Sequence, residues 1–367
     1  MTSQVLIIGA GIAGFGLAKA LSLHGVPCTM VDRLDGPPPG GMGLNLPGNA
    51  VRALAQLGVA DEVVERGVRI RRREYRNAAG RLLFSVDEEA FWAEASPSVC
   101  LRRGDLLDIL RRSTPEMTTR WGTAVVSARP IADGVRVNLR SGASQTHGFV
   151  VGSDGVGSVV RSAVTGGADT RRRSRMTDGG WRFIASNPGV DCWTAWSGRD
   201  GTFLVIPVDA QHVYGYAAAT RGGGGAGPQW LADTFADFAE PVPTIVKAAL
   251  TGGELHQSPV EEVHCTRWAR GRLVIIGDAA HATAPVWAQG AALALEDAII
   301  LADLLAANGD WDGTGQQYEH LRRHRIAHVQ AVTDRMSRIA ALPGWLRDTV
   351  APALGPRAYR AAYGPLR

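Results

Sequence analysis

The sequence predicts an α/β protein with a parallel sheet, an inserted antiparallel sheet and a C-terminal helix. Residues 5–8 and 273–276 are continuous apolar runs, the pattern of strands buried on both faces of a parallel sheet. Short segments of alternating apolar and polar residues crowd the stretch 181–220, as in an antiparallel sheet. The chain has 367 residues, which fits two interleaved domains or one large α/β unit better than a single compact core.

The first half of the chain divides into short elements at its glycines and prolines. We expect a strand at 5–8, a glycine turn at 9–14, a helix at 16–24 and a strand at 29–32. The run at 37–41 (PPPGG) predicts a loop without regular structure. Beyond it we expect a helix at 49–57, a hairpin over 69–85, a helix at 103–112 and short strands at 125–137 and 149–151.

The second half combines the antiparallel strands with long helices. We expect a flexible loop at 222–225, a buried strand at 273–277, and helices from 290 to 307 and from 316 to 340. These elements predict a discontinuous dinucleotide-binding domain at 1–68, 100–170 and 265–310. They also predict a substrate-binding domain at 69–99 and 171–264, and a C-terminal helical segment at 311–367.

Composition excludes several classes of protein. Hydrophobic residues make up 45% and charged residues 20% of the chain, so wholesale disorder and fibrous repeats are excluded. The formal net charge is +4, but the arginine runs at 71–73 and 171–173 are short and far apart. We interpret them as solvated edges rather than as a nucleic-acid footprint. With no CxxC pair, no signal peptide and no apolar run of ~20 residues, we expect a cytoplasmic protein without a membrane span.

A glycine motif follows the first strand directly. Gly9, Gly11 and Gly14 form GxGxxG and open a helix, as in folds that bind a dinucleotide. The helix N-terminus supplies free N–H groups for a pyrophosphate. Asp32 ends the second strand, where its carboxylate can accept hydrogen bonds from an adenosine ribose. The motif alone leaves open whether the dinucleotide is NAD or FAD.

A second motif favours FAD. The strand at 273–276 ends in Gly277 and Asp278, and the helix from Gly290 follows after Pro285. A carboxylate at the carboxyl end of such a strand can hold a ribityl hydroxyl. The N–H groups at the start of the helix would face the edge of a flavin that gains negative charge on reduction. A simple NAD dehydrogenase has no need of this second helix.

Two further signals are weak when taken alone. Residues 152–161 contain an Asp-Gly turn before Ser158 and Arg161, which by itself indicates only a polar turn that caps a helix. His320, His324 and His328 recur every fourth residue. This is metal-capable spacing, but no carboxylate or cysteine set completes it, so we expect no metal site.

Together, the three segments at 9–14, 154–161 and 277–290 resemble the motifs of the group A flavoprotein monooxygenases, the family with the p-hydroxybenzoate hydroxylase fold. The resemblance covers nearly the whole chain and implies a Rossmann-like, glutathione-reductase-type FAD-binding domain. The sequence departs from the family pattern at three positions. Ala288 replaces the first glycine of GQG, Ala292 stands where Asn is common, and Gly48 interrupts a Pro-Asn pair.

The resemblance implies a set of site residues. For the cofactor it implies Gly9, Gly11, Ala13, Gly14, Asp32, Arg33, Gly41, Met42, Arg103, Val125, Asp154, Arg161, Gly277, Asp278, Gly290 and Ala291. For the substrate pocket we expect Asn45, Tyr214, Tyr216, Pro285 and Trp287. Most of the ten tryptophans are expected to be core, with Trp287 the one nearest the flavin. His281 is structural in the family rather than a base.

The implied activity is an FAD-dependent monooxygenase. In the family NAD(P)H, a transient co-substrate, reduces FAD, and O₂ bound at flavin C4a as a hydroperoxide supplies the oxygen atom. The substrate would be a flat, apolar, aromatic small molecule that is hydroxylated or epoxidised, and no side-chain nucleophile is needed. The alternatives are an FAD dehydrogenase or reductase, a flavin-dependent halogenase and a flavin-loaded binding module. For a halogenase, Trp193 and Trp196 have the wrong spacing and neither lysine is suitably placed.

Overall fold

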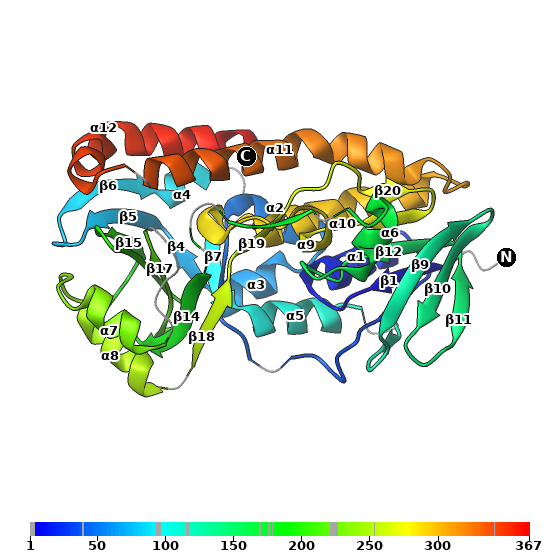
Figure 1. The fold of residues 1–367 in the computed structure, drawn as a ribbon, viewed down its shortest axis with the longest axis horizontal. Coiled ribbons are helices and arrows are strands. Elements are labelled where there is room, and N and C mark those ends of the chain that lie inside the picture. The colour runs from blue at the N-terminus through cyan, green and yellow to red at the C-terminus, as the bar shows by residue number, and fades with distance from the viewer. Residues whose placement is uncertain are drawn as a thin grey trace.

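The computed structural model is an elongated molecule built on two large sheets (Figure 1). It describes residues 4–38, 40–92, 97–114, 117–168, 170–174, 177, 179–220, 227–252, 254–340 and 342–367. One sheet lies toward the N-terminus at the right of Figure 1 and the other at the left, while two long helices run along the top of both. No described helix is both long and apolar enough to cross a membrane.

A six-stranded sheet forms the dinucleotide-binding half. Its strand order is β20-β21-β12-β1-β2-β8, and every neighbouring pair is parallel except β20 with β21. The strands β1 (Val5–Ile8), β12 (Phe149–Gly152) and β21 (Leu273–Ile275) are buried along their whole length, which explains their continuous apolar runs. The other members are β2 (Cys28–Val31), β8 (Thr119–Arg120) and β20 (Ala269–Arg270).

Two helices pack together over this sheet. They are α1 (Ile12–Leu23) and α10 (Gly290–Ala307), and Gly16 lets them approach because a Cβ there would lie 3.1 Å from a methyl group of Leu295. The helix α5 (Arg103–Arg112) also packs on α1 and has the predicted bounds. The first helix begins at Ile12 rather than at residue 16, because the second half of the glycine motif is already its first turn.

A seven-stranded sheet forms the other half, in the order β18-β14-β17-β16-β15-β5-β6. All its neighbouring pairs are antiparallel except β15 with β5. One face packs on α7 (Gln229–Phe235) and α8 (Val242–Gly252), and the other faces the dinucleotide-binding half. The strands are β5 (Arg72–Asn77), β6 (Leu82–Asp87), β14 (Gly179–Ser186), β15 (Trp193–Ser197), β16 (Gly201–Pro207), β17 (His212–Ala219) and β18 (Leu255–Pro259).

Three small sheets connect the two halves or flank them. They contain β3 (Gly43–Leu46), β4 (Val68–Ile70) and β7 (Ser98–Arg102); β9 (Val125–Ile131), β10 (Gly134–Leu139) and β11 (Ser144–His147); and β13 (Arg171–Arg173) with β19 (Glu261–Val263). The remaining short helices are α2 (Gly48–Gln56), α3 (Ala60–Arg66), α4 (Glu88–Trp92), α6 (Val159–Thr165), α9 (Asp278–His281), η1 (Pro285–Trp287) and η2 (Gly364–Leu366).

The C-terminal segment contains two long helices where the sequence predicted one. The first, α11 (Thr314–Ala340), agrees with the prediction, and the second, α12 (Gly344–Tyr363), was missed. Its interior prolines, Pro352 and Pro356, are poor helix formers and masked it in the sequence.

The interpretation that Arg73 lies on a solvated edge is wrong, because α12 covers this residue. Arg73 is 1% exposed beneath α12 and forms an ion pair with Glu88, with a nearest N–O distance of 2.8 Å. The run at 222–225, predicted as a flexible loop, lies outside the described residues. The fold class is confirmed, while the domain boundaries stay a prediction.

Candidate FAD and substrate site

The glycine loop leaves open space at the start of α1. Gly9 has φ +111°, and a Cβ there would lie 2.5 Å from the carbonyl oxygen of Ser153. A Cβ at Gly14 would lie 2.0 Å from the carbonyl oxygen of Gly9, so neither position accepts a side chain. Gly11, the N-cap, has no atom near its would-be Cβ and no side-chain cap. The first N–H groups of α1 are therefore accessible to an anion.

Asp32 holds this loop in place. One carboxylate oxygen accepts the N–H of Ala10 at 2.7 Å, and the other accepts the N–H of Leu34 at 2.8 Å. A carboxylate has about four acceptor sites, so these two bonds leave capacity for ribose hydroxyls. The ribose contact stays a prediction, and Arg33 beside it is exposed.

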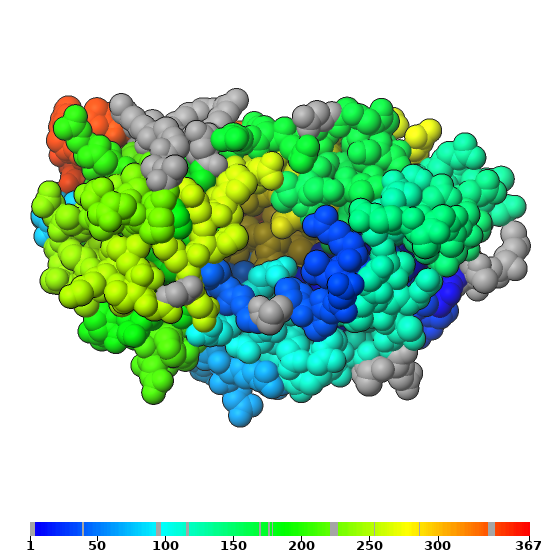
Figure 2. Space-filling model, turned by 60° about the horizontal axis from the view of Figure 1, so that its bottom comes forward, coloured from blue at the N-terminus to red at the C-terminus, as the bar shows by residue number. Residues whose placement is uncertain are grey.

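A hollow opens in the middle of one face of the molecule (Figure 2). Blue and cyan segments from the first third of the chain border it on one side, and yellow segments from the region of β18 and β19 border it on the other. A cavity of about 340 Å³ is lined by Ala10, Gly40, Arg102 and Gly104 among others. The glycine loop and the start of α5 thus share one space.

Arg103 and Asp278 are two charged side chains at this site. Neither side chain forms a hydrogen bond within the described part of the chain. Burial lowers the pKa of Arg103 and raises that of Asp278, and the charges of His281 and Arg103 partly oppose the second shift. Both residues nevertheless remain accessible. An arginine and a carboxylate in this state suit the phosphate and ribityl hydroxyls of a flavin nucleotide.

A buried ionic cluster fixes the segment after β21. Asp297 accepts the N–H of Gly277 at 2.9 Å and pairs with His281 at 2.6 Å and with Arg322 at 2.7 Å. Burial alone would raise the pKa of Asp297, but the charges and hydrogen bonds of these partners hold it well below its ordinary value. His281 is therefore structural, as the resemblance implied.

The turn before α10 shows the consequence of one departure from the family pattern. Ala288 has φ +52°, the only positive φ of a non-glycine residue in the described ranges. Glycine would adopt this conformation without strain, while alanine pays a steric cost. Gly290 then opens α10, with its would-be Cβ 3.7 Å from Asp278.

The segment at 154–161 has a structural role. Asp154 accepts from the hydroxyl of Ser158 at 2.5 Å and from the N–H of Val159 at 2.8 Å, and so caps α6. Arg161 is 6% exposed and donates to the carbonyl oxygens of Val156, at 2.5 Å, and Ala279, at 3.1 Å. Its guanidinium thereby ties α6 to α9, while its role as a cofactor contact stays a prediction.

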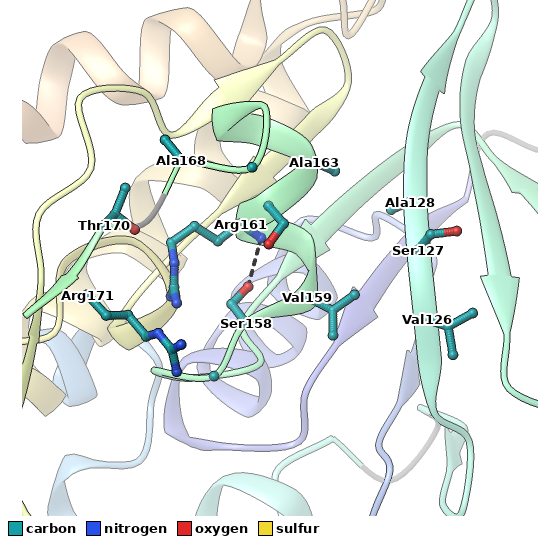
Figure 3. Close-up of a pocket in the computed structure, with 13 residues that line it drawn as sticks. Val126, Ser127, Ala128, Ser158, Val159, Arg161, Ala163, Ala168, Thr170 and Arg171 are labelled. Carbon is teal, nitrogen blue, oxygen red and sulfur yellow. Dashed lines mark hydrogen bonds between the residues drawn. The ribbon is translucent and has the colours of Figure 1, made fainter.

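A groove of about 610 Å³ runs between α6 and β9 (Figure 3). Val126, Ser127 and Ala128 line it from β9, opposite Ser158 and Val159. Its lining includes no residue of the glycine loop or of the 277–290 segment. Val125 lies at the start of β9, and its contact with the cofactor stays a prediction.

The inner face of the seven-stranded sheet forms an aromatic wall opposite β3. Tyr214 packs against Gly43, where a Cβ would lie 2.3 Å from the tyrosine Cβ. Burial raises the pKa of Tyr214 and of Tyr216 to about 12, so both hydroxyls stay protonated at neutral pH. Met42 packs against the same apolar cluster. As predicted, Tyr214 and Tyr216 share one face of β17, and Gly215 points to the other face.

Asn45 and Pro285 remain candidates for the substrate pocket, and Trp287 does not. The side-chain nitrogen of Asn45 is buried without a hydrogen-bond partner, which leaves a donor for a ligand. Pro285 is exposed. Trp287, which we expected beside the flavin, is 7% exposed and packs edge-on against Tyr363 of α12 at 5.5 Å. The turn η1 directs its indole into the core.

Gly41, Ala13 and Ala291 are the other residues expected to contact the cofactor. Gly41 has φ +131° and packs on Arg103 and Gly104, while Ala13 packs on Gly277. Ala291 is half-buried in the first turn of α10. Among the described residues, no group of three or more His, Cys, Asp or Glu side chains is arranged to hold a metal. No local sequence pattern indicated a role for Tyr363. Its hydroxyl bonds to Trp287 and Arg73, which lie 76 and 290 positions away along the chain.

The site fits FAD on independent observations: an open glycine loop, two helix N-termini without side-chain caps, unengaged Arg103 and Asp278, and the unpartnered nitrogen of Asn45. Together with an antiparallel sheet whose aromatic face adjoins the cofactor site, these features define a flavoprotein of the hydroxylase class.

Comparison with known proteins identifies the family. A family model described as "FAD binding domain" matches residues 2–336, and the chain belongs to that family. It is 31% identical over 361 residues to 2-heptyl-3-hydroxy-4(1H)-quinolone synthase of Pseudomonas aeruginosa, covering 94% of this chain and 93% of that protein. It is 30% identical to 3-amino-4-hydroxybenzoate 2-monooxygenase of Streptomyces cremeus, covering 93% and 88%.

Solved structures agree on the fold. HpxO of Klebsiella pneumoniae, crystallised with FAD and uric acid, superposes with a TM-score of 0.87 at 23% identity, covering 99% of this chain and 95% of that chain. The tetrameric 2-methyl-3-hydroxypyridine-5-carboxylic acid oxygenase gives 0.81 at 22% identity, covering 98% and 96%. The predicted resemblance, FAD as cofactor and monooxygenase activity are confirmed, and this chain is an FAD-dependent monooxygenase.

Proposed function

We propose that this monooxygenase uses NAD(P)H and O₂ to hydroxylate or epoxidise a flat, largely apolar aromatic small molecule. The observation that carries the proposal is the aromatic inner face of the seven-stranded sheet, which bears Tyr214 and Tyr216 and adjoins the FAD site at Met42 and Gly43. An apolar wall with a few hydroxyl and amide groups suits an aromatic ring with polar substituents. The named activities of the two relatives support an aromatic substrate.

Residues of the dinucleotide-binding half would hold the cofactor. The N-terminus of α1 would face the pyrophosphate, and Arg103 and Asp278 would hold its phosphate and ribityl groups. The N-terminus of α10, fixed through Gly277 and Asp297, would face the electron-accepting edge of the ring. Bound FAD supplies the redox chemistry and oxygen activation, so the site needs no side-chain nucleophile.

The chain's own contribution at the ring is orientation and exclusion of water. Ile184, Ile206 and Tyr214 form an apolar surface that keeps water from the reacting atoms, and water there would divert reducing equivalents to H₂O₂. The hydroxyls of Tyr214 and Tyr216 are neutral donors that can orient a polar ring substituent. Cytoplasmic localisation and the site of NAD(P)H docking stay predictions.

The test is a screen of aromatic compounds against the FAD-loaded protein. We expect a subset to accelerate NAD(P)H oxidation and to acquire one oxygen atom from isotopically labelled O₂. NAD(P)H oxidation coupled to reduction of the compound would instead support a dehydrogenase or reductase. Halide incorporation would support a halogenase, and a flavin that no NAD(P)H reduces would support a binding module.

A further inference from the structure

The aromatic wall carries the charged side chain of Arg182, from β14. In the pairing of β14 with β17, Arg182 stands opposite Tyr216 and Ile184 stands opposite Tyr214. Because side chains alternate along a strand, Arg182 and Ile184 share the inner face with the two tyrosines. Trp181 and Phe183, their sequence neighbours, belong to the outer cluster under α8. Arg182 therefore faces the dinucleotide-binding half.

Polar and aromatic groups hold the guanidinium of Arg182 against this wall. It lies over the ring of Tyr216, 5.8 Å from the centroid, and donates to the hydroxyl of Ser258 on β18. Its charge also acts on Tyr214, where it opposes the rise in pKa that burial causes. Three neighbouring strands thus fix the position of the guanidinium, as a binding group requires.

No carboxylate balances this charge. Several other half-buried or buried arginines of the chain pair with acids, as Arg172 does with Glu262 and Arg322 does with Asp297. Within the described ranges no Asp or Glu lies within ion-pair distance of Arg182. A partly buried cation without a counter-ion is unfavourable, and an anionic ligand would relieve this. The guanidinium has five donors, and within the described ranges its hydrogen bond to Ser258 uses one of them.

We propose that Arg182 binds an anionic oxygen of the aromatic substrate, such as an ionised carboxyl group or a phenolate, and so sets the orientation of the ring at the flavin. The proposal rests on the proposed function, because it takes the aromatic wall to be the substrate pocket. Tyr216 keeps the guanidinium flat, and the hydroxyl of Tyr214 supplies a further hydrogen bond to the same oxygen.

The test compares acids with their neutral amides on the FAD-loaded enzyme. Salicylate with salicylamide, and hydroxynaphthoate with hydroxynaphthamide, are titrated while the flavin absorbance is followed. A charge-assisted hydrogen-bonded pair is worth about 1.5–3 kcal/mol, so wild type should bind each acid about 10–100-fold more tightly than its amide. Arg182→Gln should remove that preference by weakening the acids alone, and Arg182→Lys should retain part of it.

Arg199→Gln is the matched control, because it removes the same charge from an exposed loop of the same half. It should leave every affinity unchanged. FAD content and the thermal transition of each variant report folding. The proposal is overturned if wild type binds acids no better than amides, if it binds none of the four probes, or if the preference survives in Arg182→Gln. FAD loading and substrate-stimulated NAD(P)H oxidation, measured separately, decide the proposed function.

Discussion

The C-terminal helix α12 should control how firmly the flavin is held, through a single hydroxyl. Tyr363 is fully buried, donates to the carbonyl oxygen of Trp287 at 2.7 Å and accepts from Arg73 at 3.1 Å. Trp287 immediately precedes Ala288, whose φ of +52° is strained for alanine. Tyr363 thus fixes one end of the turn that leads into α10.

Tyr363→Phe removes the hydroxyl and leaves two buried polar partners unsatisfied. Each unsatisfied partner costs about 1–3 kcal/mol, so the free energy of unfolding should fall by about 2–6 kcal/mol. Relaxation of the turn at Ala288 should also weaken FAD binding by about 1 kcal/mol, because the N-terminus of α10 moves from the flavin edge. Ala288→Gly removes the strain and should make FAD binding less sensitive to Tyr363→Phe.

Chemical unfolding and the fluorescence of released FAD measure the two effects. Tyr359→Phe is the control, because Tyr359 donates to Glu88 rather than to the turn and should change stability alone. If Tyr363→Phe loses stability but binds FAD as Tyr359→Phe does, α12 does not position the turn. If Tyr363→Phe weakens FAD binding equally with and without Ala288→Gly, strain at Ala288 plays no part in the effect.

Three other residues give further expectations. Asp32→Ala should weaken FAD binding by about 1–3 kcal/mol, because it frees the N–H of Ala10 and removes a ribose acceptor; unchanged affinity in a flavin titration would count against both roles. Hydrogen bonds and the charge of Arg172 lower the pKa of Glu262 from 4.5 to about 2, against the effect of burial. The ionised carboxylate therefore stabilises the fold fully above pH 4.5, and this stabilisation is lost as pH falls toward 2. Glu262→Gln should flatten this part of the stability curve, and an unchanged curve would refute the assignment. Tyr214→Phe should produce more H₂O₂ per NAD(P)H if its hydroxyl orients substrate, and unchanged coupling and affinity would return Tyr214 to a packing role.

Local patterns were sufficient where an element is defined by its own residues. Three elements have the predicted bounds: the strand Val5–Ile8 and the helices Arg103–Arg112 and Gly290–Ala307. A strand buried on both faces is a continuous apolar run, and the residues at a helix start are characteristic, so both can be recognised from the local sequence. The same holds for the glycine loop, where Gly9 and Gly14 face backbone too closely for any side chain. Local motifs therefore predicted the conformation of this loop, and the cofactor contacts of its residues stay a prediction.

Interactions between distant segments could not be predicted in this way. Arg73 resembled a surface charge, but its environment comes from Glu88 and from Tyr363 of a helix that prolines had masked. Trp287 was expected in the pocket, yet the same helix covers it. Arg182 had no signal because its lack of a carboxylate partner depends on which strands lie beside β14.

The flavin content of the purified protein is the decisive measurement. The open glycine loop, the unengaged Arg103 and Asp278 and the family assignment require a yellow protein that carries one FAD per chain. The FAD should be non-covalent, so denaturation should release all of it into the supernatant. A colourless protein that binds NAD but takes up no FAD on reconstitution would contradict the assignment of the cofactor site.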